Sequence, residues 1–180
     1  MKKTIWTFGL IAGVVLSVMM VVTIPFVDRI GFDAAMIVGY ASMVAAFLAI
    51  YFGIRSYRDN VLGGTISFGR SFGVGMLIAV VATLCYVATW QVVYRTTVPD
   101  FWPKWTAYEV EKARADGKSE AEIEEIRADG VKYAEMYKNP LVNSAFTFLE
   151  TMPVALIITL VSAATLSRRK RLPDGAAASA

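Results

Sequence analysis

Two residue types that carry much of protein chemistry are missing or nearly missing from this chain. Among its 180 residues there is no histidine and there is one cysteine. Without histidine, the chain lacks the commonest metal ligand and the commonest general base at neutral pH. A single thiol excludes an internal disulfide and a multi-cysteine metal site, and Cys85 lies in an apolar run where we expect a packed thiol. We therefore predict no catalytic, cofactor-binding or metal-binding residues, and a protein that is not an enzyme.

Charged residues are also scarce. They make up 18% of the chain, whereas hydrophobic residues make up 56% and the mean hydropathy is +0.51. A soluble domain usually carries about 25% charged residues, so this balance indicates that lipid surrounds much of the chain. The formal net charge of +3 is small, and we predict no nucleic-acid partner from it.

Long apolar runs take the place of charge. A helix needs about 20 residues to cross the hydrocarbon core of a bilayer, and four runs meet that length: Ile5–Phe26, Ala34–Ile54, Phe72–Val93 and Leu141–Leu166. None shows the strict alternation of a membrane β-strand. We predict an all-α, polytopic membrane protein with a four-transmembrane-helix bundle, in one domain over residues 1–172. Residues 173–180 are mostly small, and we expect a disordered tail there.

The first apolar run raises the question of a cleaved signal peptide. Met1-Lys2-Lys3 has the positive charge of a signal-peptide start. The run is longer than a typical signal core, however, and Val22-Thr23-Ile24-Pro25 lacks the small residues of a cleavage site. We predict a retained helix, with a cleaved signal as the alternative.

Lysine and arginine are distributed unevenly among the segments that connect the four runs. The segment between the first two runs holds only Arg29, flanked by Asp28 and Asp33. The segment 96–140 holds seven basic residues against ten acidic ones, a net charge of −3. The opposite ends of the runs hold nine basic residues: Lys2, Lys3, Arg55, Arg58, Arg70, Arg168, Arg169, Lys170 and Arg171. The positive-inside rule therefore places both termini and the 55–71 loop in the cytoplasm.

The segment 96–140 then lies outside the cytoplasm, and its sequence is typical of two helices. Ser119-Glu120-Ala121-Glu122 fits a capping box, and Asp116-Gly117 before it suits the end of an earlier helix. Ile123, Ile126, Tyr133 and Tyr137 form an apolar stripe at helical spacing. We predict an extracytoplasmic helical hairpin, roughly 100–115 and 119–138, between the third and fourth membrane helices.

Two blocks of sequence resemble a known family. The first is Tyr51–Asn60 (YFGIRSYRDN) followed by Gly63–Gly69 (GGTISFG), and the second is Glu135–Pro140 (EMYKNP) running into Thr147–Glu150 (TFLE). In these blocks and in its four-helix plan, the chain resembles the bacterial membrane family known as domain of unknown function 4199. The resemblance implies a bacterial inner-membrane protein and transfers no catalytic residues.

Glu150 is the most informative single residue, because a carboxylate inside a membrane helix is costly. It lies 18 residues before Arg168, which is roughly 27 Å at helical rise. Counting up the third helix from Ser71 places Gln91 at a similar depth. Glu150 is thus predicted to lie in the outer half of the membrane, across from Gln91.

We expect the Glu150 carboxylate to have a polar partner. Gln91, Tyr94 and Arg95 are the candidates on the third helix, and with Glu150 they form a candidate intramembrane polar site. Pro153, three residues on, removes a backbone donor and favours a kink beside the carboxylate. A structural ion pair is the favoured interpretation, and a proton or substrate site and a snorkelling carboxylate are the alternatives.

The cytoplasmic loop is a second candidate site. Gly63-Gly64 permits backbone conformations that other residues resist, and Thr65–Phe68 is amphipathic. Arg55, Arg58 and Arg70 are candidate contacts for anionic lipid headgroups. We favour a tight connector that contacts membrane lipids over a dedicated ligand site.

Small residues recur at four-residue spacing and predict close helix packing. The three groups are Gly9, Gly13 and Ser17; Ala45, Ala49 and Gly53; and Gly69 and Gly73. Packing within one bundle is the favoured explanation, and homodimerisation is the alternative.

The sequence leaves the function open between classes. The leading hypothesis is a non-enzymatic association or scaffold protein of the inner membrane, which binds a membrane-protein partner or a second copy through its outer hairpin or helix faces. That hypothesis assumes that the tryptophans and tyrosines of the hairpin are exposed. A small oligomeric transporter or channel around Glu150 is the alternative, and a lipid enzyme is the third, weaker one.

Overall fold

The computed structural model describes residues 1–167, and within that range every regular element is a helix. Four helices are long: α1 (Lys2–Thr23), α3 (Phe32–Val61), α4 (Phe68–Thr96) and α7 (Pro140–Leu166). Each is long and apolar enough to cross a membrane, and each contains one of the four predicted apolar runs or most of it. The 27 residues of α7 extend about 40 Å, against about 30 Å for a hydrocarbon core. The all-α prediction is confirmed, and the helices indicate a membrane protein.

Short elements join the first two long helices. The 3-10 helix η1 (Ile24–Phe26) and the four-residue α2 (Val27–Ile30) continue α1. Pro25 lies within η1, where its fixed φ suits a first helical turn. Gly31 separates α2 from α3 with a φ of +81°, which a residue with a side chain rarely adopts. The chain reverses direction at this glycine.

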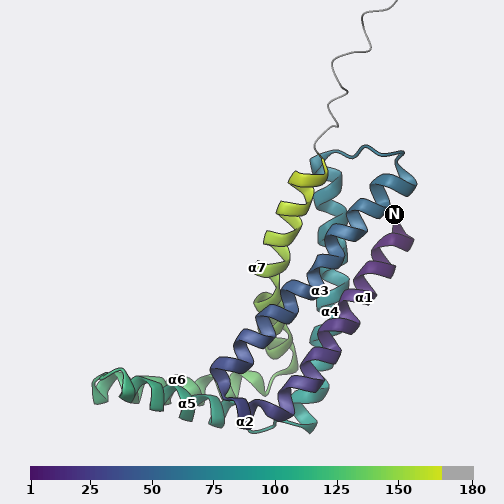
Figure 1. The fold of residues 1–180 in the computed structure, drawn as a ribbon. Helices are drawn as coiled ribbons and strands as arrows, with labels where there is room; N and C mark the ends of the chain where they lie inside the picture. The colour runs from purple at the N-terminus through teal and green to yellow at the C-terminus, as the bar shows by residue number, and fades with distance from the viewer. Residues whose placement is uncertain (168–180) are drawn as a thin grey trace, which may run out of the picture.

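The four long helices form a ring in the order α1, α3, α7, α4, because α1 and α7 each pack on both α3 and α4 (Figure 1). α1 and α4 run in the same direction, and α3 and α7 run in the opposite one. We call the end with the N-terminus and the 62–67 loop the loop end, and the other end the hairpin end. At the loop end, Gly63 and Gly64 have φ of +71° and +100°. These are backbone conformations of the kind that the two glycines were predicted to permit.

The predicted small-residue contacts bring α1 against α4. A Cβ at Gly9 would lie 2.7 Å from Val81 Cβ, and a Cβ at Gly13 would lie 2.6 Å from Cys85 Cβ. One turn further, Thr89 donates a hydrogen bond to Ser17 Oγ at 2.7 Å. The packed position of Cys85 agrees with its prediction. Gly69 and Gly73 differ, since no described atom lies within 4 Å of a Cβ built there, so these two glycines do not serve packing within the described chain.

The loop half of the bundle is closely packed. Phe47, Ile50 and Ile54 of α3 and Ile78 of α4 have no exposed surface. Gly53 and Gly75 allow this approach, because a Cβ at Gly75 would lie 2.7 Å from Thr159 Cγ2 of α7. Membrane helices gain no hydrophobic energy from each other in lipid, so close packing of this kind holds them together.

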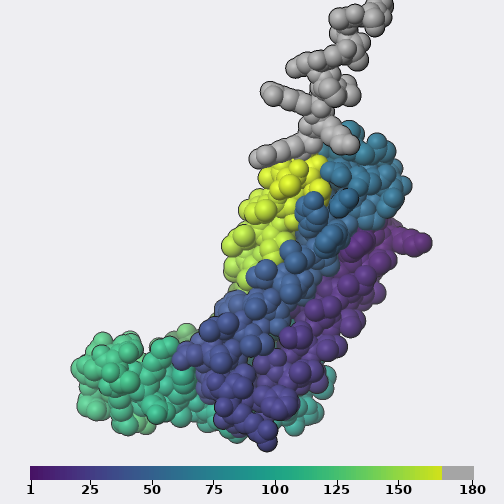
Figure 2. Space-filling model, in the orientation of Figure 1, coloured from purple at the N-terminus to yellow at the C-terminus, as the bar shows by residue number. Residues whose placement is uncertain are grey.

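The predicted hairpin is present as two helices, α5 (Phe101–Ala115) and α6 (Glu120–Tyr137), which pack on each other. The capping box forms as expected: Glu122 N donates to Ser119 Oγ, and Ser119 N donates to the Glu122 carboxylate at 2.9 Å. Gly117 in the turn has a φ of +74°. The hairpin extends sideways from the end of the bundle instead of continuing its axis (Figures 1 and 2).

Some predictions concern residues outside the described range. These are the basic residues Arg168, Arg169, Lys170 and Arg171 and the tail 173–180. The structure therefore leaves these predictions, and the C-terminal boundary of the predicted 1–172 domain, as predictions.

Candidate functional site

A cavity occupies the hairpin half of the bundle, because α3 is not packed tightly there. All buried residues of α3 lie from Met43 onward, and none lies in its first eleven residues, Phe32–Ser42. α1 likewise has no buried residue beyond Met20. α7 stays on α4 over the same stretch, with Asn143 and Thr147 buried. The start of α3 thus lies apart from α7 toward the hairpin end, and the space beside it is the candidate site.

The cavity has a volume of about 590 Å³, within the range of about 300–1,000 Å³ that is usual for small-molecule sites. Apolar and sulfur-containing side chains form much of its wall, including Leu16, Met19, Met20, Met36 and Met43. Aromatic side chains from α3, α4 and α5 form much of the rest, among them Phe32, Tyr40, Tyr86, Trp90, Phe101 and Trp105. Several lining residues, Met36 and Tyr40 among them, are exposed, so the cavity opens to the surroundings of the bundle.

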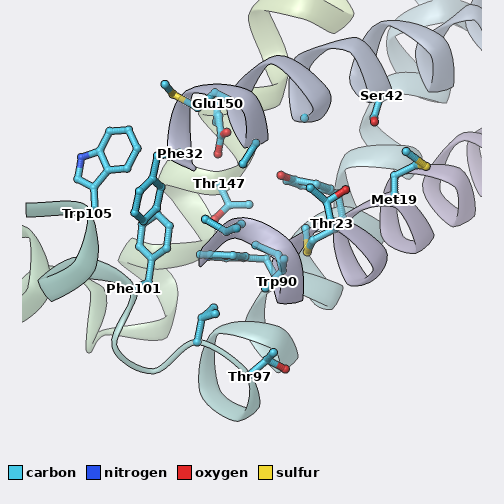
Figure 3. A pocket seen from close by; sticks show the side chains of 18 of the residues that line it. Met19, Thr23, Phe32, Ser42, Trp90, Thr97, Phe101, Trp105, Thr147 and Glu150 are labelled. Carbon is cyan, nitrogen blue, oxygen red and sulfur yellow. The ribbon is translucent and has the colours of Figure 1, made fainter. Parts of the chain in front are cut away.

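Glu150 is the charged group inside this cavity. Its side chain points into the cavity beside Thr147, in the space that Phe32 and Trp90 also line (Figure 3). Within residues 1–167 the carboxylate has neither an ion pair nor a hydrogen bond. Its position is ten residues beyond Pro140, or about 15 Å along α7 from the hairpin end. An ionisable group at such a depth usually marks a functional site.

The expected contact of Glu150 with Gln91 or Arg95 is wrong, because the two helices are aligned differently. Thr83 of α4 pairs with Thr151 of α7 at 3.1 Å, and Gln91 donates to Ser144 Oγ at 3.0 Å. This antiparallel alignment places Glu150 level with residues 84 and 85 of α4. Arg95 is ten or eleven residues further, about 15 Å away along the axis. The depth estimate failed because it counted each helix from its own end and did not contain the offset between α4 and α7 that the Thr83–Thr151 contact shows.

The other members of the predicted polar site lie nearer the hairpin. Gln91 donates both to Ser144 and to the Pro140 carbonyl, at 3.0 and 3.3 Å, and so ties α4 to the start of α7. Arg95 is exposed. The Tyr94 ring contacts Trp90 and Tyr137, with centroid distances of 5.6 and 5.9 Å. Tyr94 therefore belongs to the aromatic cluster that closes the hairpin end.

That cluster is a connected set of rings from the bundle and the hairpin. Its members are Phe32, Trp90, Tyr94, Phe101, Trp102, Trp105, Tyr108, Tyr133, Tyr137 and Phe146. Trp102 joins the two hairpin helices, since its ring lies 5.2 Å from that of Tyr133 and 4.8 Å from that of Tyr137. The hairpin rings were expected to face outward, and this expectation is wrong for most of them. They pack on the bundle and line the cavity.

Polar contacts also hold the hairpin to the start of α3. Lys104 of α5 pairs with Asp28 at 2.9 Å and with Asp100 at 3.3 Å. Tyr108 donates a hydrogen bond to Asp33, and Lys112 pairs with Asp33 at 3.4 Å. The hydrogen bonds to Asp28 and Asp100 raise the pKa of Lys104, which favours the charged form of the lysine that makes these pairs. Asp28 and Asp33 thus position the hairpin.

The cavity ends inside the bundle. Its deepest lining residues are Leu16, Met43, Tyr86 and Glu150. Toward the loop end, Ala46, Phe47 and Ala82 are buried, at 3%, 0% and 0% exposed. The Thr83–Thr151 hydrogen bond closes the seam between α4 and α7 at the same level. The space is therefore a pocket entered from one half of the bundle, without a continuation into the loop half of the described chain.

Comparison with protein families agrees with this architecture. The profile of a family described as Protein of unknown function (DUF4199) matches residues 7–168. The chain belongs to this family. The match covers most of α1, the other three long helices and the hairpin, and so it includes both sequence blocks that carried the resemblance. No curated protein and no solved structure matches the chain.

Two of the three loop-end arginines contact other groups of the chain. Arg58 pairs with Asp59 at 2.7 Å and donates to the Leu166 carbonyl at 3.4 Å, which satisfies a free acceptor at the end of α7. Arg55 lies 3.6 Å from the same Asp59. Arg70 is exposed. Contact of Arg55, Arg58 and Arg70 with lipid headgroups stays a prediction.

The pocket combines an apolar wall with a few polar groups. Among residues 1–167, no three His, Cys, Asp or Glu side chains gather closely enough to hold a metal ion. The polar groups at the pocket are an unpaired carboxylate, hydroxyls such as those of Ser42 and Thr147, and the Asp28–Lys104 pair at its rim. An apolar pocket with a few convergent polar groups is the usual form of a ligand site. Sequence reasoning found Glu150 and missed the pocket, because no local pattern encodes the separation of α3 from α7.

Proposed function

We propose that this protein is a non-enzymatic membrane protein that binds a largely apolar small molecule in the pocket at its hairpin end. The observation that carries the proposal is a pocket of about 590 Å³ whose wall contains both apolar side chains and the carboxylate of Glu150. Binding gives a reason to keep that costly group at a site without a structural partner. Catalysis has less support, since the carboxylates Asp28 and Asp33 are engaged with the hairpin.

The hairpin end is proposed to face away from the cytoplasm of a bacterial cell, with the protein in the inner membrane and both termini in the cytoplasm. Support comes from the basic residues Lys2, Lys3, Arg55, Arg58 and Arg70, which all belong to the loop end. In this orientation the ligand enters the pocket from the outer leaflet or from the outer aqueous phase. The sideways course of the hairpin then lays α5 and α6 along the membrane surface (Figure 1).

A transport function, the alternative around Glu150, has partial support. The pocket reaches Glu150 from one end, as a transport pathway would. The closely packed loop half, where Phe47, Ile50 and Ile78 have no exposed surface, favours binding over conduction. Reconstituted protein that moves the bound ligand or protons across a vesicle membrane would establish transport in place of binding.

A cavity-filling variant tests the proposal. Gly39 lines the pocket, and no described atom lies within 4 Å of a Cβ built there, so Gly39→Leu fills the space without a backbone clash. Gly73→Leu is the matched control, because Gly73 is also helical with open space around it but does not line the pocket.

Tryptophan fluorescence supplies the readout, because Trp90, Trp102 and Trp105 line the pocket. The background variant Trp6→Phe removes the remaining tryptophan, which lies near the loop end. We expect bromophenylpropanol, a neutral probe whose bromine quenches tryptophan, to quench saturably in Trp6→Phe and in Gly73→Leu. Gly39→Leu should lose the saturable phase. Equal quenching in both leucine variants contradicts a binding pocket.

Association remains a second candidate, supported by the exposed face of the hairpin. Val131 of α6 is 66% exposed and lies beside a groove between α5 and α6 that Pro103, Ala107 and Ala134 also line. Crosslinking in native membranes followed by mass spectrometry tests it. Crosslinks that involve α6 and that Val131→Lys abolishes support a partner or a second copy at this face, and their absence contradicts it.

A further inference from the structure

We propose that the ligand of this pocket carries a protonated amine, which pairs with Glu150 while the rest of the molecule contacts the apolar wall. This inference rests on the proposed binding function and adds to it the chemical class of the ligand. It is argued from the charges, the aromatic side chains and the apolar surface that share the pocket.

Charge is the first argument. The charged residues that line the pocket are Asp28, Lys104 and Glu150. Asp28 and Lys104 lie 2.9 Å apart and neutralise each other at the rim. The formal charge of the three is −1 + 1 − 1 = −1, so one negative charge inside the pocket has no partner in the described chain. Such a charge is stabilised by a cation, and a carboxylate pairs well with an ammonium group.

Aromatic faces are the second argument. Tyr40, Tyr86, Trp90 and Tyr137 line the same pocket as Glu150 and come from three different helices, α3, α4 and α6. Aromatic rings attract ammonium groups through the negative charge of their faces, most strongly where water is excluded. The pKa of Tyr137 is raised to about 12, mainly by burial and in addition by the charge of Glu150. That ring therefore lies within the field of the carboxylate. Rings and carboxylate together favour a cation over an anion or a neutral polar group.

The apolar wall is the third argument. Four methionines, Met19, Met20, Met36 and Met43, line the pocket. Methionine side chains are flexible and adapt to ligands of varied shape. Since Glu150 lines the same pocket as these methionines, a ligand that reaches the carboxylate is in contact with this wall. The ligand class is therefore an amine with an attached hydrocarbon or aromatic body.

A matched pair of probes tests the inference. Bromophenylpropylamine and bromophenylpropanol have similar shapes, and only the amine is charged at neutral pH. In Trp6→Phe protein, we expect the amine to quench the pocket tryptophans with an affinity about tenfold higher than that of the alcohol, which corresponds to about 1.4 kcal/mol. Glu150→Gln, which keeps the size of the side chain, should abolish this preference. Glu135→Gln is the control, because Glu135 pairs with Lys138 on exposed surface and should leave the preference unchanged.

The outcomes separate the two proposals. Equal affinities of amine and alcohol in unmodified protein, or a preference that survives Glu150→Gln, overturn the amine inference and leave the pocket standing. Failure of both probes to quench saturably overturns both proposals. Loss of the preference in Glu150→Gln with retained binding of the alcohol supports both, and shows in addition that the variant is folded.

Two sources can supply such an amine: a lipid headgroup of the outer leaflet or a soluble amphiphile. Nanodiscs distinguish them. If phosphatidylethanolamine occupies the pocket, its presence in the disc lowers the apparent affinity of bromophenylpropylamine relative to discs of phosphatidylglycerol. Unchanged affinity assigns the pocket to a soluble amine.

Discussion

The two halves of the helix bundle differ in how closely their backbones approach. In the loop half, Gly9, Gly13, Gly53 and Gly75 each face atoms that would lie within 3 Å of an added Cβ. In the hairpin half, Gly39 faces open space and lines the pocket. Because lipid supplies no hydrophobic force between helices, the hairpin half lacks the close contacts that hold the loop half together.

Other contacts take over in the hairpin half. The aromatic cluster joins α3, α4 and α7 to the hairpin, and the Lys104–Asp28 and Lys112–Asp33 pairs hold α5 against the start of α3. Aromatic pairs contribute about 0.5–1.5 kcal/mol each beyond the area that they bury. The comparison indicates a division of roles, in which one half provides stability and the other provides a site.

Alanine substitution at two glycines gives the largest contrast between the halves. Gly13→Ala places a methyl group 2.6 Å from Cys85 Cβ, so α1 and α4 must separate, and we expect a loss of about 1–3 kcal/mol in the free energy of unfolding. Gly39→Ala meets nothing within 4 Å and should gain about 0.5–1 kcal/mol from helix propensity. Thermal unfolding in detergent measures both. If both substitutions change the stability in the same direction, the proposed difference in packing between the two halves is contradicted.

Replacing the carboxylate in the pocket should stabilise the protein. Glu150→Leu removes a charge that has no partner within residues 1–167, and we expect a gain of about 1 kcal/mol. This is less than the ~2.5–3.5 kcal/mol cost of a charged side chain at the centre of a membrane helix, since Glu150 is exposed to the open pocket. A loss of stability in the same unfolding assay would show that Glu150 has a structural role.

The boundary between the halves is marked by a hydrogen bond that a double-mutant cycle can measure. Thr83 and Thr151 are both fully buried, and their hydroxyl oxygens lie 3.1 Å apart. Such bonds between membrane helices contribute on average about 0.6 kcal/mol. We expect a coupling energy of that size between Thr83→Val and Thr151→Val. If the effects of the two substitutions on stability are additive, packing alone holds α4 and α7 together at the inner end of the pocket.

The smallest effect concerns the ion pairs of the hairpin. Replacing Lys104 and Lys112 with glutamine should broaden the distance distribution between spin labels at Val44 and Ala128, measured by pulsed EPR, with little change in its mean because the aromatic contacts remain. The raised pKa of Lys104, caused by Asp28 and Asp100, determines how the ion pair responds to pH. The pairing is complete below the ordinary lysine pKa and is lost as pH rises through the raised value. A shifted mean in the double variant would show that charge, rather than the rings, places the hairpin.

Local patterns predicted the elements, and distant contacts decided the site. The capping box at Ser119 and Glu122, the turn at Gly117 and the small-residue stripe that contains Gly9 and Gly13 are each formed by residues close in sequence. Their physical causes, free backbone groups and the lack of a Cβ, can be recognised from sequence alone.

The pocket and its surroundings depend on relations that sequence spacing does not contain. Asp28 meets Lys104, and Asp33 meets Lys112, each across more than seventy residues. The level of Glu150 relative to α4 depends on how two helices slide along each other, which the Thr83–Thr151 contact fixes. Both depend on the assembled bundle, and this is why the predicted contact of Glu150 with Arg95 is wrong.

The fixed offset between α1 and α4 has a consequence for how the molecule is made. Gly9 meets Val81 and Gly13 meets Cys85, so each contact joins positions 72 residues apart, 81 − 9 and 85 − 13. When the first helix leaves the ribosome, the surface that receives its glycines has yet to be synthesised. Until α4 is inserted, the glycine stripe of α1 has only lipid or α3 beside it, and the contact between α1 and α4 forms only when this third long helix arrives.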